Sequence, residues 1–364
     1  PQLAKTVIPR KMKDVIPRYQ TMRGRYVRRV WGWDCHGLPV ENMIEKDLGL
    51  KNKKDIEEYG IEKFNEAARA SVLRYDAEWE KMISRIGRWV DMDHAYKTMD
   101  ANYSESIWWA FKNLYDKGLI YQNFKSMQIC PRCETTLSNN EVTQGYKDIT
   151  DISVTAKFEL VDEPGTFVLA WTTTPWTLPG NVALAVNPKE EYAEVSFENK
   201  KYIVAQARVE KTFLGKEHSI LKTMKGSDLV GKLYRPIFDY YAKNQTLENR
   251  ANGWKIYGAD FVTMESGTGI VHIAPAFGED DMNLGKREKL PFIQHVGMDG
   301  KMKSEVIDFH GVQAKPKDDH QSTDILIIKH LAKIERLFSK EKIIHAYPHC
   351  WRCDTPLLNY AHSS

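Results

Sequence analysis

The chain has 364 residues, of which 42% are hydrophobic and 28% charged, and its formal net charge is +3. This length allows two or three domains with ample cores, and the composition is ordinary for a globular protein. So small a charge neither requires nor excludes a nucleic-acid partner. The sequence contains no run of about 18 apolar residues, so no segment is predicted to span a membrane. The N-terminus also lacks the apolar segment of a signal peptide. We therefore expect a cytoplasmic protein.

Both ends of the sequence predict a fragment of a longer protein. There is no initiator Met, the tetrapeptide VIPR occurs at 7–10 and again at 15–18, and the chain stops at LLNYAHSS without a capping signal. The short-period copy is typical of a local duplication or of an engineered join. We expect a piece cut at both ends.

The first part of the chain predicts strands alternating with helices. Residues 21–46 contain a strand, a turn at HGLP and a helix that ends at Gly49. Apolar residues at a period near 3.6 predict helix over 61–90. A further helix is expected over 101–118, with Asp100 as its N-cap and Gly118 just after its end.

From about residue 150 the pattern changes to short β-branched runs separated by turns. TFVLAWTT (166–173) and VALAV (182–186) predict strands, and YAEVSF-EN-KKYIVA (192–205) predicts a hairpin. Two more strands are expected in DFVTMESGTGIVHIAP (260–275), and a helix over 324–337. The sequence therefore predicts a compact β-rich domain over 150–320, inserted between residues 1–149 and a return segment, 321–364.

Four of the five cysteines form two pairs with the same local pattern, CPRCETTL at 130–137 and CWRCDTPL at 350–357. Two C-x₂-C units are the usual way to build a tetrahedral zinc site with four thiolates. Disulfides are the poorer interpretation in a cytosolic protein, and reduced buried thiols or a degenerate site are the alternative. We predict structural zinc that pins together the two ends of the insertion. Its ligands are Cys130, Cys133, Cys350 and Cys353.

Three motifs in order carry a family resemblance: GWDCHGLPVE (32–41), WTTTPWTLPGN (171–181) and GTGIVHIAPAFGEDD (267–281). Together they resemble isoleucyl-tRNA synthetase, a class I aminoacyl-tRNA synthetase, over essentially the whole chain. The resemblance implies an α/β fold: a partial Rossmann-like catalytic domain with an inserted β-barrel-like editing domain. In that family a synthetic pocket rejects valine by only about one to two orders of magnitude, a limit for which isoleucyl enzymes are the usual example. A second pocket then hydrolyses the wrong ester.

The resemblance places the editing residues in the second and third motifs. Hydroxyl and amide groups there would hold the adenosine and a water, while His272 would restrict the pocket to valine-sized side chains. Asp281, rather than Asp280, would grip the substrate ammonium, and the GTG stretch at 267–269 would allow close backbone approach. Threonines in a turn, a lone strand histidine and a solvated acidic pair are the structural alternatives. The predicted editing residues are Thr172, Thr173, Thr174, Thr177, Asn181, His272 and Asp281.

In the first motif the resemblance implies an isoleucine pocket in which Asp34 binds the amino group and Trp33, His36 and Pro39 give the shape. The alternative is a strand end with bulky core residues. The HIGH and KMSKS elements of the family are not in this sequence, so we expect that this chain alone does not form the adenylate, and that ATP and Mg²⁺ belong to the parent enzyme only.

The sequence therefore predicts an editing hydrolase of mischarged Val-tRNA(Ile), with tRNA(Ile), isoleucine and valine as partners, Zn²⁺ as the bound metal and no membrane association. No Ser/His/Asp or Cys/His nucleophile arrangement is evident, so a positioned water fits the hydrolysis better than a covalent intermediate. The alternative is a non-catalytic, zinc-stabilised module that binds tRNA acceptor ends, or a truncated gene product.

Overall fold

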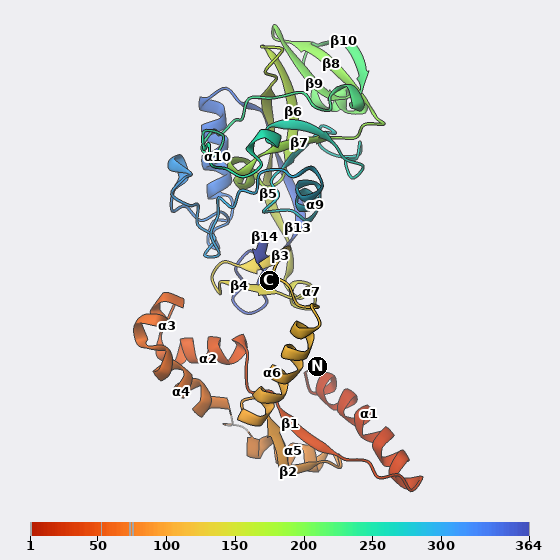
Figure 1. Ribbon diagram of the computed structural model, residues 1–364, viewed down its shortest axis with the longest axis vertical. Helices are drawn as coiled ribbons and strands as arrows, with labels where there is room; N and C mark the ends of the chain where they lie inside the picture. The colour runs from red at the N-terminus through yellow and green to blue at the C-terminus, as the bar shows by residue number, and fades with distance from the viewer. Residues whose placement is uncertain (1, 52, 73, 75, 364) are drawn as a thin grey trace. The chain divides into compact units, whose positions relative to one another are not determined.

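The computed structural model describes residues 2–51, 53–72, 74 and 76–363. The chain divides into two compact units, one ending at Tyr121 and the other beginning at Gln122. In Figure 1 the second unit starts in yellow and runs through green to blue at the C-terminus. Within the described residues, no helix combines the length and the apolar content that crossing a membrane requires.

The first unit contains one parallel pair of strands, β1 (Val30–Trp33) and β2 (Asp91–Lys97). Parallel neighbours need a long crossover connection, and helices occupy that crossover here, as the predicted α/β class requires. The described helices of the first unit are α1 (Gln2–Met22), α2 (Leu38–Leu48), α3 (Lys53–Tyr59), α4 (Ile61–Val72), α5 (Asp76–Arg85) and α6 (Ala101–Asp116).

In this unit the capping residues and glycines predicted the ends of helices better than the 3.6-residue apolar period did. α6 begins after Asp100 and is followed by Gly118 in the left-handed conformation (φ +68°), and α2 ends at left-handed Gly49, all as predicted. The single helix predicted over 61–90 is wrong. It is divided into α4 and α5, and left-handed Gly87 (φ +70°) then turns the chain toward β2. Residues 73 and 75 of that prediction lie outside the described residues.

The second unit is built on a nine-stranded mixed sheet. β11 lies parallel to β7 and β9 parallel to β6, whereas β12 is antiparallel to β7. The described strands form an open path, so the predicted barrel-like domain is confirmed in part, as a mixed sheet that forms a half-barrel. In spatial order they are β10 (Ser219–Lys225), β8 (Glu191–Phe197), β9 (Lys200–Ala205), β6 (Thr166–Thr172), β12 (Val271–Ile273), β7 (Ala183–Val186) and β11 (Lys255–Gly258), while β5 (Tyr146–Glu159) pairs with both β6 and β13 (Leu337–Pro348).

Two of the strand predictions in this unit have different outcomes. The hairpin is confirmed: β8 and β9 are joined by Glu198 and Asn199, which both have positive φ (48° and 59°), as a two-residue hairpin turn demands. The pair of strands predicted over 260–275 is half wrong, because only β12 forms. Gly267 and Gly269 both adopt left-handed φ (58° and 71°) and break the extended run before it.

The two ends of the insertion lie side by side. β13 runs antiparallel to β5, with Pro348 opposite Tyr146 and Leu337 opposite Ala156. A small sheet of β14 (Leu358–Ser363), β3 (Phe124–Cys130) and β4 (Thr135–Leu137) adjoins this ladder in sequence. The remaining helices described here are α7 (Asn139–Val142), α8 (Val209–Thr212), α9 (Glu279–Glu288) and α10 (Ser322–Lys333). α10 thus ends four residues before the predicted end, since Leu337 already belongs to β13.

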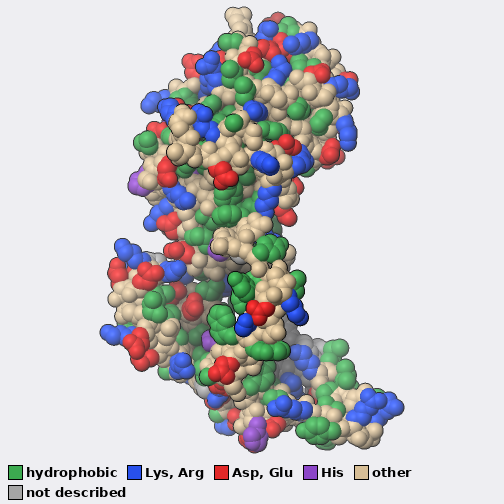
Figure 2. All heavy atoms as spheres, viewed as in Figure 1, with side chains coloured by type: hydrophobic (Ala, Val, Ile, Leu, Met, Phe, Trp, Pro, Cys, Tyr) green, Lys and Arg blue, Asp and Glu red, His purple; other side chains and the backbone are tan. Residues whose placement is uncertain are grey.

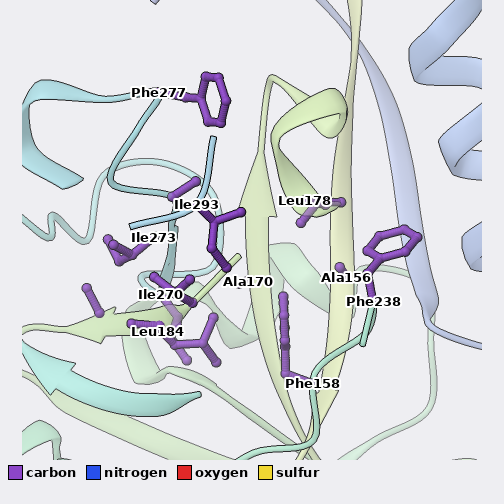
Figure 3. Close-up of a cluster of buried hydrophobic side chains, with 14 of the residues drawn as sticks. Ala156, Phe158, Ala170, Leu178, Leu184, Phe238, Ile270, Ile273, Phe277 and Ile293 are labelled. Carbon is purple, nitrogen blue, oxygen red and sulfur yellow. The ribbon is translucent and has the colours of Figure 1, made fainter. Parts of the chain in front are cut away.

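The main core of the second unit holds the end of β6 and the turn that follows it. Figure 3 shows Leu178 in the same buried cluster as Ala156 and Phe158 of β5, Ala170 of β6 and Leu184 of β7. Leu178 belongs to the short helix η1 (Pro175–Gly180), and both Leu178 and Trp176 expose only 2% of their surface. Burying side chains of this size stabilises the fold by about 1.5–3 kcal/mol each, so the turn is anchored by its apolar residues.

Charged side chains of both signs cover the second unit. On the face shown in Figure 2, Lys and Arg are interspersed with Asp and Glu over its surface. Some pairs reach inward: Glu194 of β8 is 2% exposed and lies 3.3 Å from the Lys201 ammonium and 3.0 Å from that of Lys222. The near balance of 52 basic and 49 acidic residues in the sequence is therefore also a local balance on this face.

Candidate functional site

One cavity of the second unit collects most of the polar residues that the motifs singled out. It has a volume of about 290 Å³ and lies where the end of β6, the segment 261–274 and the start of α9 meet. Two separate stretches of chain, about a hundred residues apart in sequence, therefore form one site. The predicted residues that line it are Thr172, Thr173, Thr174, Thr177, His272 and Asp281.

The hydroxyl groups of the threonine turn (residues 172–177) form a connected array. The oxygens of Thr172 and Thr174 lie 3.3 Å apart, and those of Thr174 and Thr177 lie 3.4 Å apart. The Thr174 amide donates to the Thr172 hydroxyl at 3.1 Å, and the Thr177 amide and hydroxyl both donate to the Thr174 carbonyl, at 2.9 and 2.8 Å. Pro175 fixes φ at the start of η1, so the array is held by backbone as well as by side chains.

His272 closes one side of this array. Its Nε2 lies 2.9 Å from the Thr177 hydroxyl oxygen, and burial lowers the pKa of the ring to about 4. The ring is therefore neutral at pH 7. Since the Thr177 proton already points to the Thr174 carbonyl, a proton on Nε2 donated to Thr177 satisfies both groups. Nδ1 then carries the lone pair, and it has no partner among the described residues.

Asp281 lies in the first turn of α9, where the helix N-terminus favours a negative charge. Its Oδ2 accepts a hydrogen bond from the Ala274 amide at 2.8 Å. Burial nevertheless raises its pKa to about 7, and the neighbouring Asp280 charge adds to the increase. Asp280 itself is exposed and does not line the cavity. The structure thus offers one half-buried carboxyl group that titrates near neutrality and lines the same cavity as the threonine hydroxyls.

Asn181 is not brought to the cavity. Its amide donates to the Ala183 carbonyl at 2.9 Å, and its oxygen accepts from the buried Tyr234 hydroxyl at 2.7 Å. Both polar ends of this side chain are therefore occupied inside the fold, and the structure gives Asn181 a supporting position at the end of η1.

Sequence reasoning missed several residues of the wall. Thr268 is buried and donates to the Leu169 carbonyl at 2.6 Å. The signal for this part was the GTG stretch: a Cβ on Gly269 would lie 2.3 Å from the Cβ of Ala205 on β9, and one on Gly267 would touch Trp171. The close backbone approach inferred from GTG is confirmed. The glycines pack against adjacent strands of the same polypeptide, at Trp171 and Ala205. The missed wall residues include Trp171, Phe261, Thr263, Ser266, Thr268 and Phe277.

The four paired cysteines meet at the base of the insertion. Their sulfur atoms all lie within 4.8 Å of one another, and Cys353 Sγ is 3.5 Å from Cys130 Sγ and 3.7 Å from Cys133 Sγ. A tetrahedral Zn–S site with bonds of about 2.3 Å has S–S edges near 3.8 Å, whereas a disulfide needs about 2.05 Å. The group therefore fits a tetrahedral metal ion. One half comes from the end of β3 and the loop after it, and the other from the loop after β13.

In the first unit the residues predicted for an isoleucine pocket are only partly collected. His36 lines a cavity of about 300 Å³, together with Cys35 and Glu41. Trp33 instead packs edge-on against Trp31 at 5.6 Å, whereas Asp34 and Pro39 are exposed. None of these three lines that cavity, so the structure brings one of the four predicted residues to a pocket wall.

The family model of class I tRNA synthetases (I, L, M and V) matches residues 6–352. The isoleucine–tRNA ligase of Treponema denticola is 45% identical, with 98% of this chain and 35% of that protein covered. Those of Clostridium acetobutylicum and Bacillus thuringiensis are also 45% identical, with 98% of this chain and 33% of each protein covered. The chain thus spans about a third of the length of the curated relatives it matches.

Solved structures give a weaker likeness. The editing domain of the P. knowlesi cytosolic leucyl-tRNA synthetase matches with a TM-score of 0.31 and 16% identity, covering 40% of this chain and 67% of that one. The P. falciparum editing domain gives a TM-score of 0.31 at 14% identity, covering 38% and 67%. A likeness at this score does not establish a common fold.

The pKa of Asp281 leads to a prediction on stability. Because the folded state raises this pKa from 3.8 to about 7, folding favours the neutral carboxyl group, and the wild type loses stability as the pH rises from about 4 to about 7. Asp281→Asn keeps an acceptor for the Ala274 amide without the charge. We expect it to exceed the wild type in unfolding free energy by about 1–3 kcal/mol at pH 7.5 and by little at pH 4. Urea unfolding at both pH values, with exposed Asp280→Asn as the control, measures this. A difference that does not depend on pH would contradict it.

Proposed function

The chain belongs to the class I tRNA synthetases of the isoleucine, leucine, methionine and valine group, and on that premise we propose that its second unit hydrolyses mischarged Val-tRNA(Ile). The observation that supports this most strongly is the cavity itself. It joins a threonine hydroxyl array, a neutral buried histidine and a carboxyl group that titrates near pH 7. Its volume of about 290 Å³ lies at the small end of ligand sites, about 300–1,000 Å³, which suits a small aminoacyl end.

In this proposal Asp281 holds the amino acid. A substrate ammonium beside a half-buried carboxylate stabilises the charged form, so binding lowers the Asp281 pKa and forms a charge-assisted hydrogen bond. The helix N-terminus at Gly278 supports the charge. Editing requires the amino acid to be held in one register, and the ammonium is the group that every aminoacyl ester offers.

His272 limits the size of the side chain that the pocket admits. It is buried, its position is fixed by Thr177, and its neutral ring contributes bulk without charge. A rigid wall of this kind excludes isoleucine by overlap and admits valine, which is one methylene smaller. The hydroxyl groups of Thr172, Thr173 and Thr174 are the donors and acceptors proposed to hold the terminal adenosine and a water.

The contact between Thr177 and His272 has the spacing of a nucleophile and its base, but its surroundings favour hydrolysis by water. A working pair needs a third group that orients the histidine, and Nδ1 of His272 has no partner among the described residues. The Thr177 proton is also directed to the Thr174 carbonyl. We therefore propose that water attacks the ester carbonyl directly, positioned by the hydroxyl array.

The remaining assignments follow the same family. We propose residues 150–320 as the editing domain, with tRNA(Ile) and valine as its partners. Isoleucine, ATP and Mg²⁺ are proposed as partners of the full-length synthetase, with Trp33, Asp34, His36 and Pro39 in the isoleucine pocket. Zn²⁺ is proposed as the ion of the cysteine cluster, where it would join the two ends of the insertion and leave no open position for catalysis.

Deacylation by two variants tests the proposed site. Asp281→Ala removes a charge-assisted contact worth about 2–4 kcal/mol, so hydrolysis of Val-tRNA(Ile) should fall by roughly 30- to 1000-fold. His272→Ala enlarges the pocket, so Ile-tRNA(Ile) should become a substrate and selectivity should fall. The assay follows release of valine and isoleucine from both charged tRNAs.

Asp280→Ala is the matched control for the first variant, since Asp280 is adjacent, identical in type and exposed. It should keep activity within about threefold of the wild type. Full activity of Asp281→Ala would remove the proposed ammonium site, and full loss in Asp280→Ala would transfer that role to Asp280. A wild-type protein that binds the acceptor end without turnover would favour the alternative of a non-catalytic module.

Metal analysis tests the cysteine cluster. The purified protein should hold close to one zinc per chain, and chelation should lower its melting temperature, because a closed structural site contributes folding free energy. Cys353→Ser should lose the metal. Cys35→Ser is the control, since Cys35 is a buried free cysteine outside the cluster. A metal-free protein that melts no lower than the zinc-loaded one would contradict the structural role.

Adenylate formation is the remaining part of the proposal. The HIGH and KMSKS elements that grip ATP in the family are not in the printed sequence. We therefore expect the 364-residue polypeptide, assayed by itself, to show no isoleucine-dependent exchange of pyrophosphate into ATP. Robust exchange would show that other residues of this chain hold the triphosphate.

A further inference from the structure

Three fully buried charged side chains lie next to the threonine turn. Lys315, Asp151 and Asp324 each expose 1% or less of their surface. The Lys315 ammonium donates to both oxygens of Asp151, at 2.7 and 2.8 Å, and to Oδ2 of Asp324, at 3.0 Å. Two carboxyl groups from distant parts of the chain thus share one ammonium in the interior.

The two carboxyl groups have different surroundings. Asp151 is also approached by two histidines, with His345 Nε2 at 3.2 Å and His320 Nε2 at 3.9 Å. Asp324 has Lys315 on one oxygen, and its other oxygen, Oδ1, accepts from the backbone amide of Trp176 at 3.2 Å. Burial raises the pKa of Asp324 to about 6 in spite of Lys315. Buried ionic groups are weak evidence for stability. What this arrangement does specifically is to fix the position of Oδ1 of Asp324.

Trp176 is held at both of its backbone polar groups. Its amide donates to Asp324, which is 148 residues away, and its carbonyl accepts from Nε2 of buried His295 at 2.9 Å. Its ring packs edge-on against Phe277, a residue of the cavity wall, with centroids 5.3 Å apart. A backbone segment fixed in this way has little freedom to shift relative to the sheet.

Trp176 lies between Thr174 and Thr177, and both of these line the cavity. The Thr177 amide and hydroxyl bond to the Thr174 carbonyl, and the Thr177 oxygen also contacts His272. These contacts connect the whole turn, so a displacement of the Trp176 amide would displace the hydroxyl array and its contact with His272 together.

We infer that Asp324, held by Lys315, is a positioning residue that fixes the threonine turn through the Trp176 amide. Asp324 lies on α10 and does not line the cavity, so it acts on the reaction only through the turn. The kinetic part of this inference rests on the proposed deacylase function, whereas the structural part does not.

The test compares two variants in the full chain. Asp324→Leu has the same branched shape and no acceptor, whereas Asp324→Asn keeps one carbonyl oxygen for the Trp176 amide. The readouts are hydrogen exchange of the Trp176 amide in ¹⁵N-tryptophan-labelled protein, and kcat and KM for Val-tRNA(Ile) deacylation. Glu194→Gln is the matched control, since Glu194 is another buried carboxyl group between lysines, on β8 and outside the cavity wall.

For Asp324→Leu we expect Trp176 exchange at least about tenfold faster and kcat reduced by about ten- to a hundredfold, with KM within about threefold of the wild type. Asp324→Asn should restore both readouts to within about threefold, and Glu194→Gln should leave both unchanged. Should Asp324→Leu fail to fold, Lys315→Met replaces it, because it releases Asp324 from its fixed position and should move both readouts in the same direction.

Wild-type exchange of the Trp176 amide in Asp324→Leu would overturn the inference whatever the activity. Faster exchange with unchanged kcat would overturn the kinetic part, as would a loss of kcat in Asp324→Asn equal to that in Asp324→Leu. A wild-type protein without deacylase activity would instead overturn the proposed function, and the exchange data alone would then decide whether Asp324 fixes the turn.

Discussion

The antiparallel ladder between β5 and β13 is the interaction on which the second unit depends. It pairs residues as far apart in sequence as Tyr146 and Pro348, and closing a loop of this length costs about 4–5 kcal/mol of chain entropy. The ladder offsets that cost with backbone hydrogen bonds along most of β13. It also brings the loops that carry the two cysteine pairs to the same end, so one metal ion between them would reinforce the same closure.

The threonine turn depends on this sheet in a different way. β6 delivers the chain to the cavity, and the turn then places apolar side chains inward and hydroxyl groups outward. Trp176 and Leu178 enter the core, whereas Thr174 and Thr177 face the cavity. The position of the threonine hydroxyl groups is thus fixed by the buried apolar side chains of the same segment. Such an arrangement holds hydroxyl groups in place without ligand, and preorganised groups lose little free energy of ordering when a substrate arrives.

Local signals in the sequence predicted local structure well. Glu198–Asn199 predicted the hairpin, Gly118 the end of α6, and the cysteine spacing the two loops that meet. The failures involve partners that no local pattern reveals. Asn181 is turned inward by Tyr234, which lies in a segment without periodic signal, and left-handed glycines stop the strand predicted before β12. The contact of Asp324 with the turn depends on a fold that brings α10 to η1, so the sequence alone gave no reason to single it out.

His272 and Asp281 titrate in different pH ranges, so the shape of the cavity wall and the charge of its carboxyl group depend differently on pH. With a pKa of about 4, the histidine stays uncharged throughout the physiological range, so the shape of the wall is insensitive to acidity. With a pKa of about 7, the carboxyl group is partly protonated when the cavity is empty, and in the proposed function an arriving ammonium would displace that proton into the solvent. In the proposed function, occupancy of the cavity would therefore be coupled to proton release, whereas discrimination between side chains by size would not. An acidic shift would weaken the grip on every amine ligand equally and leave the ranking of side chains unchanged.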